Sequence, residues 1–198
     1  MSDFSFVTDL FIFLMVFFAG FIDCIAGGGG MITIPTYLSA GLQPSLVLGT
    51  NKFVSSIGTL SAVIRLLRSV KINIAIVVAG GIFAIVGSVI GAYLSSYLSH
   101  NIMIIMLLII IPTILAIGSF SSYKTLSDYQ LNTLFFIRLI LVCFFIAGYD
   151  GFFGPGTGTF LFISLMYLLN MSAQESVVNA KIINFIANFS ALLYFLCV

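Results

Sequence analysis

The sequence predicts an all-α integral membrane protein, a helical bundle built from two inverted-topology repeats with short Gly-interrupted helices. The first observation behind this fold class is composition. Of the 198 residues, 61% are hydrophobic and 7% are charged, and the mean hydropathy is +1.26. Soluble domains are about 45–50% apolar and about 25% charged. A chain this apolar cannot cover itself with polar side chains, so we expect its surface to face lipid, in the inner or plasma membrane of the cell.

The second observation is the pattern of apolar segments. A helix needs about 20 apolar residues to cross the hydrocarbon core of a bilayer. Six segments approach or exceed this length: Phe6–Ile25, Pro44–Leu67, Ile72–Leu98, Ile102–Ser119, Leu131–Tyr149 and Gln174–Val198. Two others, Met31–Ala40 and Thr159–Asn170, are shorter and follow glycines. We therefore expect a multi-pass protein whose two short helices do not span the bilayer unless they are tilted or joined to the helix before them.

The third observation is that the same features occur twice in the same order. An Ala-Gly pair leads to an aspartate, a glycine cluster, a short apolar segment, a polar break and a lysine, first from Ala19 to Lys52 and again from Ala147 to Lys181. Five apolar segments separate the starts of the two units, and an odd number of crossings turns the second unit upside down. Inverted repeats with paired, Gly-interrupted segments are typical of secondary transporters.

The repeat divides the chain into three parts. We expect the first repeat and the helix that follows it in residues 1–118, a connecting loop in residues 119–130, and the second repeat in residues 131–198. The second unit has no counterpart of the segment Ile72–Leu98. We therefore expect the second repeat to be incomplete at its C-terminus.

Local signals predict several helix starts. Pro44 fits the first turn of a helix, and Ser172 followed by Glu175 fits a capping box. The first apolar segment has no Lys or Arg before it, so it lacks the basic region of a signal peptide. We expect it to remain as a membrane helix.

Basic residues predict the orientation of the chain. Arg65, Arg68 and Lys71 surround one connection, Lys124 lies in the central loop, and Arg138 is close enough to extend back toward that loop. If both short segments cross the membrane, the two connections share one side. The positive-inside rule makes that side cytoplasmic and puts the N-terminus outside.

The two glycine clusters, Gly27–Gly30 and Gly154–Gly158, disfavour a regular helix, and Pro155 also removes a backbone donor. Unpaired backbone is tolerated at membrane depth only where it lines a cavity or is buried in protein. A helix that starts at such a break presents free N–H groups and a positive end, which can hold an anion. Close packing of helices through small residues is the alternative interpretation.

Two lysines, Lys52 and Lys181, lie inside apolar segments. A lysine at a helix centre costs roughly 2.5–3.5 kcal/mol on insertion scales, so each must face the protein interior and find a partner. Thr50 and Asn51 precede the first lysine, and Asn184 lies one turn beyond the second, on the same helix face. The lysines form either internal ion pairs with the aspartates or a cationic pair that faces a substrate anion.

The two aspartates have several open roles. Asp23 and Asp150 can pair with the lysines, carry coupled protons, or cap the broken helices. A further alternative is an intramembrane aspartyl-type hydrolase in which the two carboxyl groups share a proton. Against it, Asp23 follows Gly-Phe-Ile rather than the G-x-G that precedes the acid in such enzymes, and nearby lysines would keep both acids ionised.

Other function classes are not indicated. The sequence contains no G-x-x-x-x-G-K-[ST], G-x-S-x-G or H-E-x-x-H, so we expect neither an ATP site nor an enzyme. The net charge of +1 predicts no nucleic-acid partner. The three cysteines and one histidine lack the spacing of a metal site, so we expect no metal and no cofactor. A homo-oligomer is compatible with the sequence.

Two long stretches resemble a known family. "GFIDCIAGGGGMITIPTYLSAGLQPSLVLGTNKFVSSIGTLSAVIR" resembles the first signature of the sulfite exporter TauE/SafE family, and "GYDGFFGPGTGTF" with "NAKIINFIANFSALLYF" resembles the second. The resemblance implies a multi-pass transporter with two repeats that exports or imports a small sulfur-containing anion, such as sulfite or a sulfonate. Members of the family usually run on for tens of residues, so we expect a C-terminally truncated member, with a non-transporting remnant as an alternative.

The repeat and the resemblance together define the candidate substrate site. We expect alternating access between the two repeats, with a small anionic substrate bound between the helix breaks. The candidate substrate-binding residues are Asp23, Gly27, Gly28, Gly29, Gly30, Thr50, Asn51, Lys52, Asp150, Gly154, Pro155, Gly156, Thr157, Gly158, Lys181 and Asn184.

Overall fold

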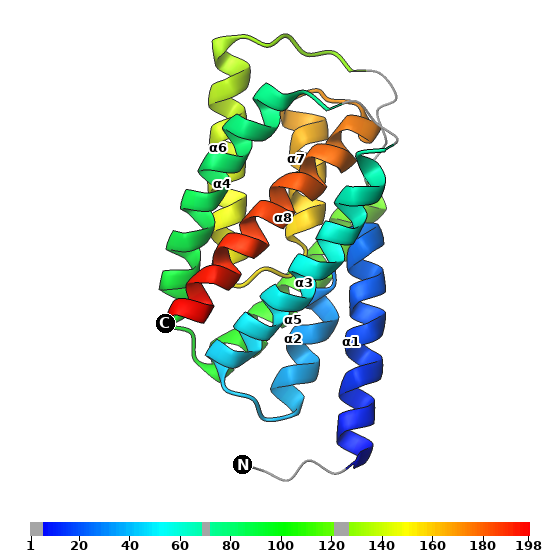
Figure 1. Ribbon diagram of the computed structural model, residues 1–198, viewed down its shortest axis with the longest axis vertical. Coiled ribbons are helices and arrows are strands. Elements are labelled where there is room, and N and C mark those ends of the chain that lie inside the picture. Colours follow the sequence, from blue (N-terminus) through cyan, green and yellow to red (C-terminus); the bar gives the residue numbers. More distant parts are fainter. Residues whose placement is uncertain (1–5, 69–71, 121–126) are drawn as a thin grey trace.

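A computed structural model describes residues 6–68, 72–120 and 127–198, and these contain eight α-helices and no β-strand (Figure 1). The helices are α1 (Phe6–Ala26), α2 (Gly30–Ser39), α3 (Pro44–Leu66), α4 (Ile74–Ser95), α5 (His100–Phe120), α6 (Thr133–Phe152), α7 (Thr157–Leu168) and α8 (Ala173–Cys197). Each of the eight predicted apolar segments corresponds to one helix, with ends that differ by a few residues. The prediction of an all-α membrane protein is therefore confirmed.

The helix lengths agree with the predicted division into long and short segments. Among the described residues, α3, α4, α5, α6 and α8 are long and apolar enough to cross a membrane. The short helices α2 and α7 have 10 and 12 residues. At about 1.5 Å per residue, each covers roughly half of a 30 Å hydrocarbon core.

Two predicted helix starts are present in the structure. Pro44 occupies the first turn of α3. At the start of α8, the Ser172 side chain accepts from the Glu175 backbone N–H, and the Glu175 side chain accepts from the Ser172 backbone N–H. This capping box satisfies backbone donors that a helix start leaves without intrahelical partners.

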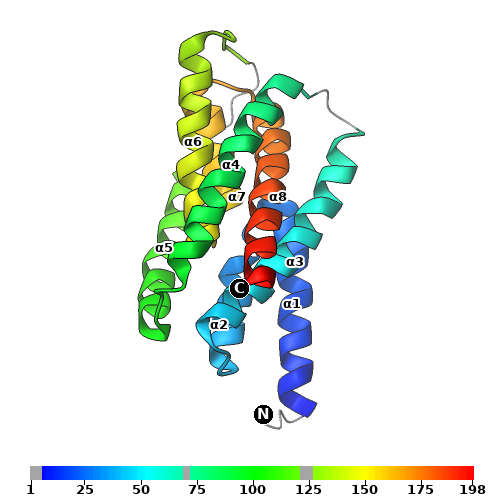
Figure 2. The ribbon, with the colours of Figure 1, turned by 60° about the vertical axis from the view of Figure 1, so that its left-hand side comes forward.

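The two long–short–long helix groups run in opposite directions. In Figure 1, α1 rises to mid-height, α2 returns downward and α3 rises again, whereas α6 descends to mid-height, α7 rises and α8 descends. Figures 1 and 2 both place α6 to the left of α1, with α8 between them. Both short helices therefore start near mid-height and run toward opposite ends of the bundle.

Apolar packing is concentrated in two main clusters. One joins α4, α6, α7 and α8 through side chains such as Leu139, Leu161 and Ile183. The other joins α2, α3 and α5 and includes Ile34 and Leu48. Each short helix belongs to a different cluster, and Phe153, in the break between α6 and α7, joins the second cluster.

Glycines allow α4 and α6 to approach closely. Gly87 and Gly91 of α4 lie against the backbone of Phe144 and Gly148, and Gly151 of α6 lies against the backbone of α4. A methyl group at any of these glycines would overlap main-chain atoms of the other helix. Small residues at such positions are typical of helix pairs in membranes.

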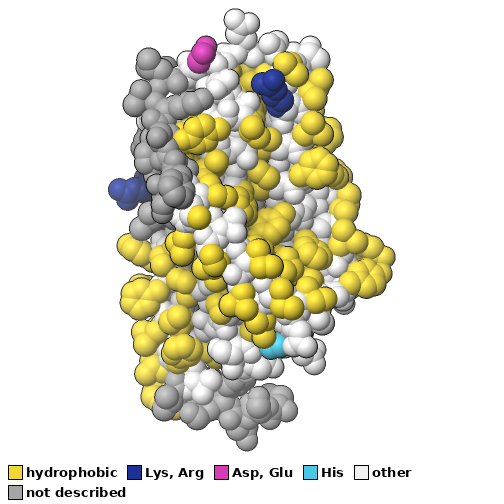
Figure 3. All heavy atoms as spheres, turned by 180° about the vertical axis from the view of Figure 1, so that it is seen from behind, with side chains coloured by type: hydrophobic (Ala, Val, Ile, Leu, Met, Phe, Trp, Pro, Cys, Tyr) yellow, Lys and Arg dark blue, Asp and Glu magenta, His cyan; other side chains and the backbone are white. Residues whose placement is uncertain are grey.

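The outer surface of the bundle is apolar. Large side chains such as Phe13, Phe17, Leu108 and Ile109 are more than 60% exposed. Figure 3 shows one face rich in hydrophobic side chains, and the described Lys, Arg, Asp and Glu side chains visible on it lie in the upper half of the view. A surface of this kind suits contact with lipid.

The described basic residues at helix ends lie at one end of the bundle. Arg65 is in the last turn of α3, Arg68 follows it, and Arg138 is in the second turn of α6; all three are exposed. The end of α3 and the start of α6 both lie at the upper end in Figure 1. Lys71 and Lys124 are outside the described residues.

We predict that Gly91→Ala destabilises the protein because the added methyl group meets the α6 backbone. Overpacking costs about 1–3 kcal/mol, and each kcal/mol corresponds to about 2–4 °C for a chain of this size. The midpoint of thermal unfolding of the purified protein in detergent measures the effect. The matched control is Gly20→Ala on α1, where an added Cβ meets nothing within 4 Å. Equal midpoints for the two variants would contradict the packing argument.

Candidate functional site

The two helix breaks touch each other at the centre of the bundle. An ideal Cβ at Gly27 would lie 2.9 Å from the Gly158 Cα, and one at Gly30 would lie 3.3 Å from the Pro155 Cα. Gly27 and Gly154 also adopt φ values of 74° and 102°, which favour glycine. Any side chain at the Gly27–Gly158 contact would push the two breaks apart. Close packing through small residues therefore does occur here, and it brings the charged side chains of both breaks together.

Lys52 forms a buried ion pair with an aspartate from the other half of the chain. Its Nζ lies 2.8 Å from Oδ2 of Asp150, and the lysine is 0% and the aspartate 1% exposed. At this distance the two opposite charges are in direct contact. The Lys52 ammonium also donates to Oδ1 of Asn188, at 3.1 Å. Lys52 thus connects α3 to both α6 and α8.

Lys181 makes the reciprocal connection from α8 to α1. Its ammonium donates a hydrogen bond to the backbone carbonyl of Asp23 and interacts electrostatically with the Asp23 carboxylate. The same carbonyl accepts from the Gly27 N–H at 3.0 Å. It belongs to the last turn of α1, where carbonyl groups lack intrahelical partners and a positive charge is favoured. The lysine of each half of the chain therefore binds the helix end that carries the aspartate of the other half.

Asp23 caps the break between α1 and α2. Its Oδ1 accepts from the Gly29 N–H at 3.0 Å, next to the start of α2. The group at this helix start is therefore the chain's own carboxylate, and the predicted role of the first glycine cluster in binding a substrate anion stays a prediction. The other oxygen, Oδ2, is buried without a hydrogen-bond partner among the described residues. Of the roles left open by the sequence, Asp23 has the capping role and Asp150 the ion pair.

Polar side chains surround the two breaks. Asn51 accepts from the Thr33 hydroxyl at 2.5 Å, and its oxygen lies 3.4 Å from an ideal Cβ at Gly30. Asn188 donates to the carbonyl and side-chain oxygens of Asn184, at 2.9 and 3.0 Å. Asn184 in turn lies beside Gly158. These amides can donate or accept, so they can bind an anion or stabilise the lysines.

Most of the predicted site residues come together, but Thr50 does not join them. It is half-buried and lines a groove with Leu46, Ser95 and Phe195, on the side of α3 away from Lys52. Gly28, Gly156 and Thr157 are buried within the breaks. The Thr157 hydroxyl donates to the Gly154 carbonyl at 2.7 Å.

The sequence did not predict three contacts at this centre. Asn188 follows Lys181 by seven residues, which predicts a shared helix face, yet its side chain contacts Lys52 on α3. Thr33 was not among the candidates, although a hydroxyl in a short apolar helix was a signal that could have identified it. Tyr149 is a further participant, because its hydroxyl donates to the Pro155 carbonyl at 2.7 Å.

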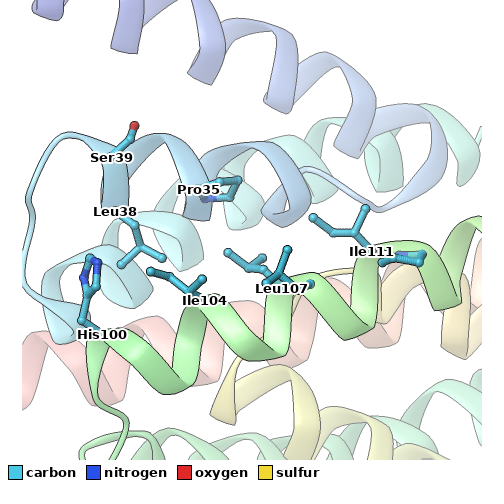
Figure 4. Close-up of a pocket in the computed structure, with 9 residues that line it drawn as sticks. Pro35, Leu38, Ser39, His100, Ile104, Leu107 and Ile111 are labelled. Carbon is cyan, nitrogen blue, oxygen red and sulfur yellow. The ribbon is translucent and has the colours of Figure 1, made fainter.

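A separate groove between α2 and α5 does not suit an anion. It has a volume of about 470 Å³ and is lined mainly by apolar side chains from the two helices. Figure 4 shows Leu38 and Ile104 directed into the space between these helices, with His100 at one end. The structure therefore favours the helix breaks over this groove as the functional site.

The fold and this buried charged centre define a multi-pass helical membrane protein with two interrupted helices. A model of the sulfite exporter TauE/SafE family matches residues 12–197, so the chain belongs to this family. A probable membrane transporter protein of Haemophilus influenzae is 36% identical over 188 residues, which cover 93% of this chain and 72% of the relative.

Two further relatives have similar names. The probable membrane transporter protein ORF9 of a Sinorhizobium species is 35% identical over 197 residues, covering 99% of this chain and 75% of the relative. The probable membrane transporter protein YfcA of Escherichia coli K12 is 31% identical over 195 residues, covering 93% and 69%. No solved structure matches the chain. These names support a role in membrane transport rather than in enzymatic catalysis.

We predict that losing one member of the Lys52–Asp150 pair destabilises the protein more than losing both. Lys52→Met or Asp150→Leu leaves one buried charge without its ion-pair partner, which costs about 3–5 kcal/mol. The midpoint of thermal unfolding in detergent should fall by roughly 10 °C in each single variant. The fall should be smaller in the double variant, with exposed Arg65→Met as a control that leaves the midpoint unchanged. Additive losses in the double variant would show that the two residues stabilise the protein independently.

Proposed function

We propose that this protein is a secondary transporter of a small anion, either a sulfur oxyanion such as sulfite or an organosulfonate. The observation that carries the proposal is that Lys52 and Lys181, from different halves of the chain, reach the two touching helix breaks while nearly fully buried. Two buried ammonium groups beside two helix N-termini favour a negatively charged ligand. The family description, sulfite exporter, supports the choice of anion class.

The anion binds between the breaks in this proposal. Lys52 and Lys181 supply positive charge, the starts of α2 and α7 supply backbone N–H groups, and Asn51 and Asn184 supply side-chain amides. A sulfonate or sulfite has three oxygens around one sulfur, so it can accept from several of these donors at once. A small tetrahedral or pyramidal anion uses such convergent donors better than a planar or extended one.

Alternating access follows from the arrangement of the halves. The helix groups α1–α3 and α6–α8 run in opposite directions (Figure 1), which supports an inverted repeat. We propose residues 1–118 and 131–198 as the two units, joined by residues 119–130. Side chains do not interlock at the contact of Gly27 with Gly158, so one break can slide on the other. The Arg65 end of the bundle then faces the cytoplasm.

The hydrolase alternative has less support. Asp150 is paired with Lys52, and the Asp23 carboxylate caps the start of α2, so each acid has its own partner. An aspartyl-type mechanism needs the two carboxyl groups to share a proton. The relatives are also named as transporters.

We predict that Lys52→Ala lowers anion flux. The measurement is uptake of sulfite, thiosulfate and taurine into proteoliposomes that contain the purified protein. Loss of a charge-assisted hydrogen bond costs about 1.5–3 kcal/mol, so flux should fall roughly tenfold to a hundredfold. An unchanged flux would remove the proposed role of this amine.

A second variant separates charge from structure. Lys181→Gln can still donate to the Asp23 carbonyl, so it keeps the hydrogen bond to α1 and loses only the positive charge. It should lower flux, and it should lower the midpoint of thermal unfolding less than Lys181→Ala, which loses the hydrogen bond as well as the charge that interacts with Asp23. Arg65→Gln, an exposed position at the helix end, is the matched control and should transport like the wild type. Absence of flux for all three anions in the wild type would contradict the proposed substrate class.

A further inference from the structure

The four charged side chains of the buried centre have no net charge in the absence of a ligand. They are Lys52, Lys181, Asp23 and Asp150, each less than 5% exposed. Two positive and two negative charges sum to zero. An anion that enters this centre therefore adds an uncompensated negative charge in a region of low dielectric, which is strongly unfavourable.

The residues around Asp150 offer little positive charge that could compensate a bound anion. From α3 it faces Lys52, and from α7 the Thr157 hydroxyl lies within hydrogen-bonding reach. The neighbouring Tyr149 hydroxyl is directed to the Pro155 carbonyl. Helix α4, which packs along α6, contains no Asp, Glu, Lys, Arg or His, and its Ser88 hydroxyl donates to the Ala187 carbonyl. On α8 the nearest basic residue, Lys181, is bonded to Asp23 on α1.

An anion that binds Lys52 must compete with Asp150 for the same ammonium. The Lys52 Nζ already has two partners, Asp150 and Asn188, and the lysine is completely buried. Once displaced, the carboxylate is a buried charge without its ion-pair partner, which costs about 3–5 kcal/mol. If Asp150 takes up one proton, its negative charge is removed and the net charge of the centre with its bound anion is again zero.

We infer that Asp150 is the proton-binding residue of the transporter and that one proton travels with each monovalent anion. This inference rests on the proposed function. The anion takes the place of the carboxylate at Lys52, and Asp150 binds a proton from the compartment that supplied the anion. On the other side both leave, the O–H bond of Asp150 breaks, and the ion pair with Lys52 forms again. The loaded and the empty centre are then both neutral.

Asp23 does not suit this role. Its carboxylate accepts from the Gly29 N–H, and Lys181 is hydrogen-bonded to its backbone carbonyl rather than to its carboxylate. An anion that recruits Lys181 therefore leaves the Gly29 contact of Asp23 in place. Only Asp150 loses the direct partner of its carboxylate when a ligand binds.

Proton counting in proteoliposomes tests the inference. Methanesulfonate is the probe, because it is fully ionised at working pH and carries no proton itself. A gradient of this anion is imposed, the membrane potential is clamped with valinomycin and potassium, and the internal pH is followed with pyranine. We expect about one proton per anion for the wild type and for Asp150→Glu, and none for Asp150→Asn. Flux through Asp150→Asn should also become dependent on membrane potential.

The outcomes separate the two levels of the proposal. Absence of flux of methanesulfonate, sulfite, thiosulfate and taurine in the wild type overturns the proposed function and this inference together. Anion flux without proton movement overturns only proton coupling. One proton per anion in Asp150→Asn, or its loss in the matched variant Asp23→Asn alone, overturns the assignment to Asp150.

A chemical readout on the wild-type protein avoids any effect of the variants on folding. Dicyclohexylcarbodiimide modifies protonated buried carboxyl groups, and mass spectrometry of the digested protein locates the product. Methanesulfonate should increase modification of Asp150 and leave that of Asp23 unchanged. Unchanged modification of Asp150, or an increase confined to Asp23, would contradict the inference.

Discussion

A charged lysine cannot remain in the interior of a membrane protein without a partner, and the fold depends on how this chain satisfies that constraint. Lys52 and Lys181 each find a partner on the other half of the chain, at the last turn of α6 and of α1. Helices that break at mid-height have negative ends there, and these ends favour the ammonium groups. The broken helices and the buried lysines thus stabilise each other.

This mutual dependence explains why the two halves pack as one body. The two main apolar clusters include different short helices, and neither contains the charged residues. Apolar packing holds the long helices together but does not discriminate strongly between similar registers. The ion pair and the Lys181 hydrogen bond require particular atoms to meet, and the glycines at the breaks allow the backbones to come close enough.

The same centre has the properties that transport of a charged solute demands. A permanent charge would bind a counter-ion too strongly, and a purely apolar centre would exclude it. An internal ion pair lies between these extremes, because a ligand can replace one partner at a moderate net cost. The two aspartates differ: one accepts a hydrogen bond from a backbone N–H, and the other depends on Lys52, the lysine to which the proposed anion would bind.

The sequence alone determined the eight helices, the two breaks, the capping box at Ser172 and the membrane class, because hydropathy, glycine content and capping act over a few residues. It also identified both lysines and both aspartates as candidate site residues, because a charged side chain in an apolar segment is costly unless it has a partner or a function. Only the tertiary structure decided that Lys52 pairs with Asp150, that Asp23 caps α2, and that Asn188 accepts a hydrogen bond from Lys52. Helical spacing defines a face of one helix, whereas the partner of that face depends on which helix packs against it.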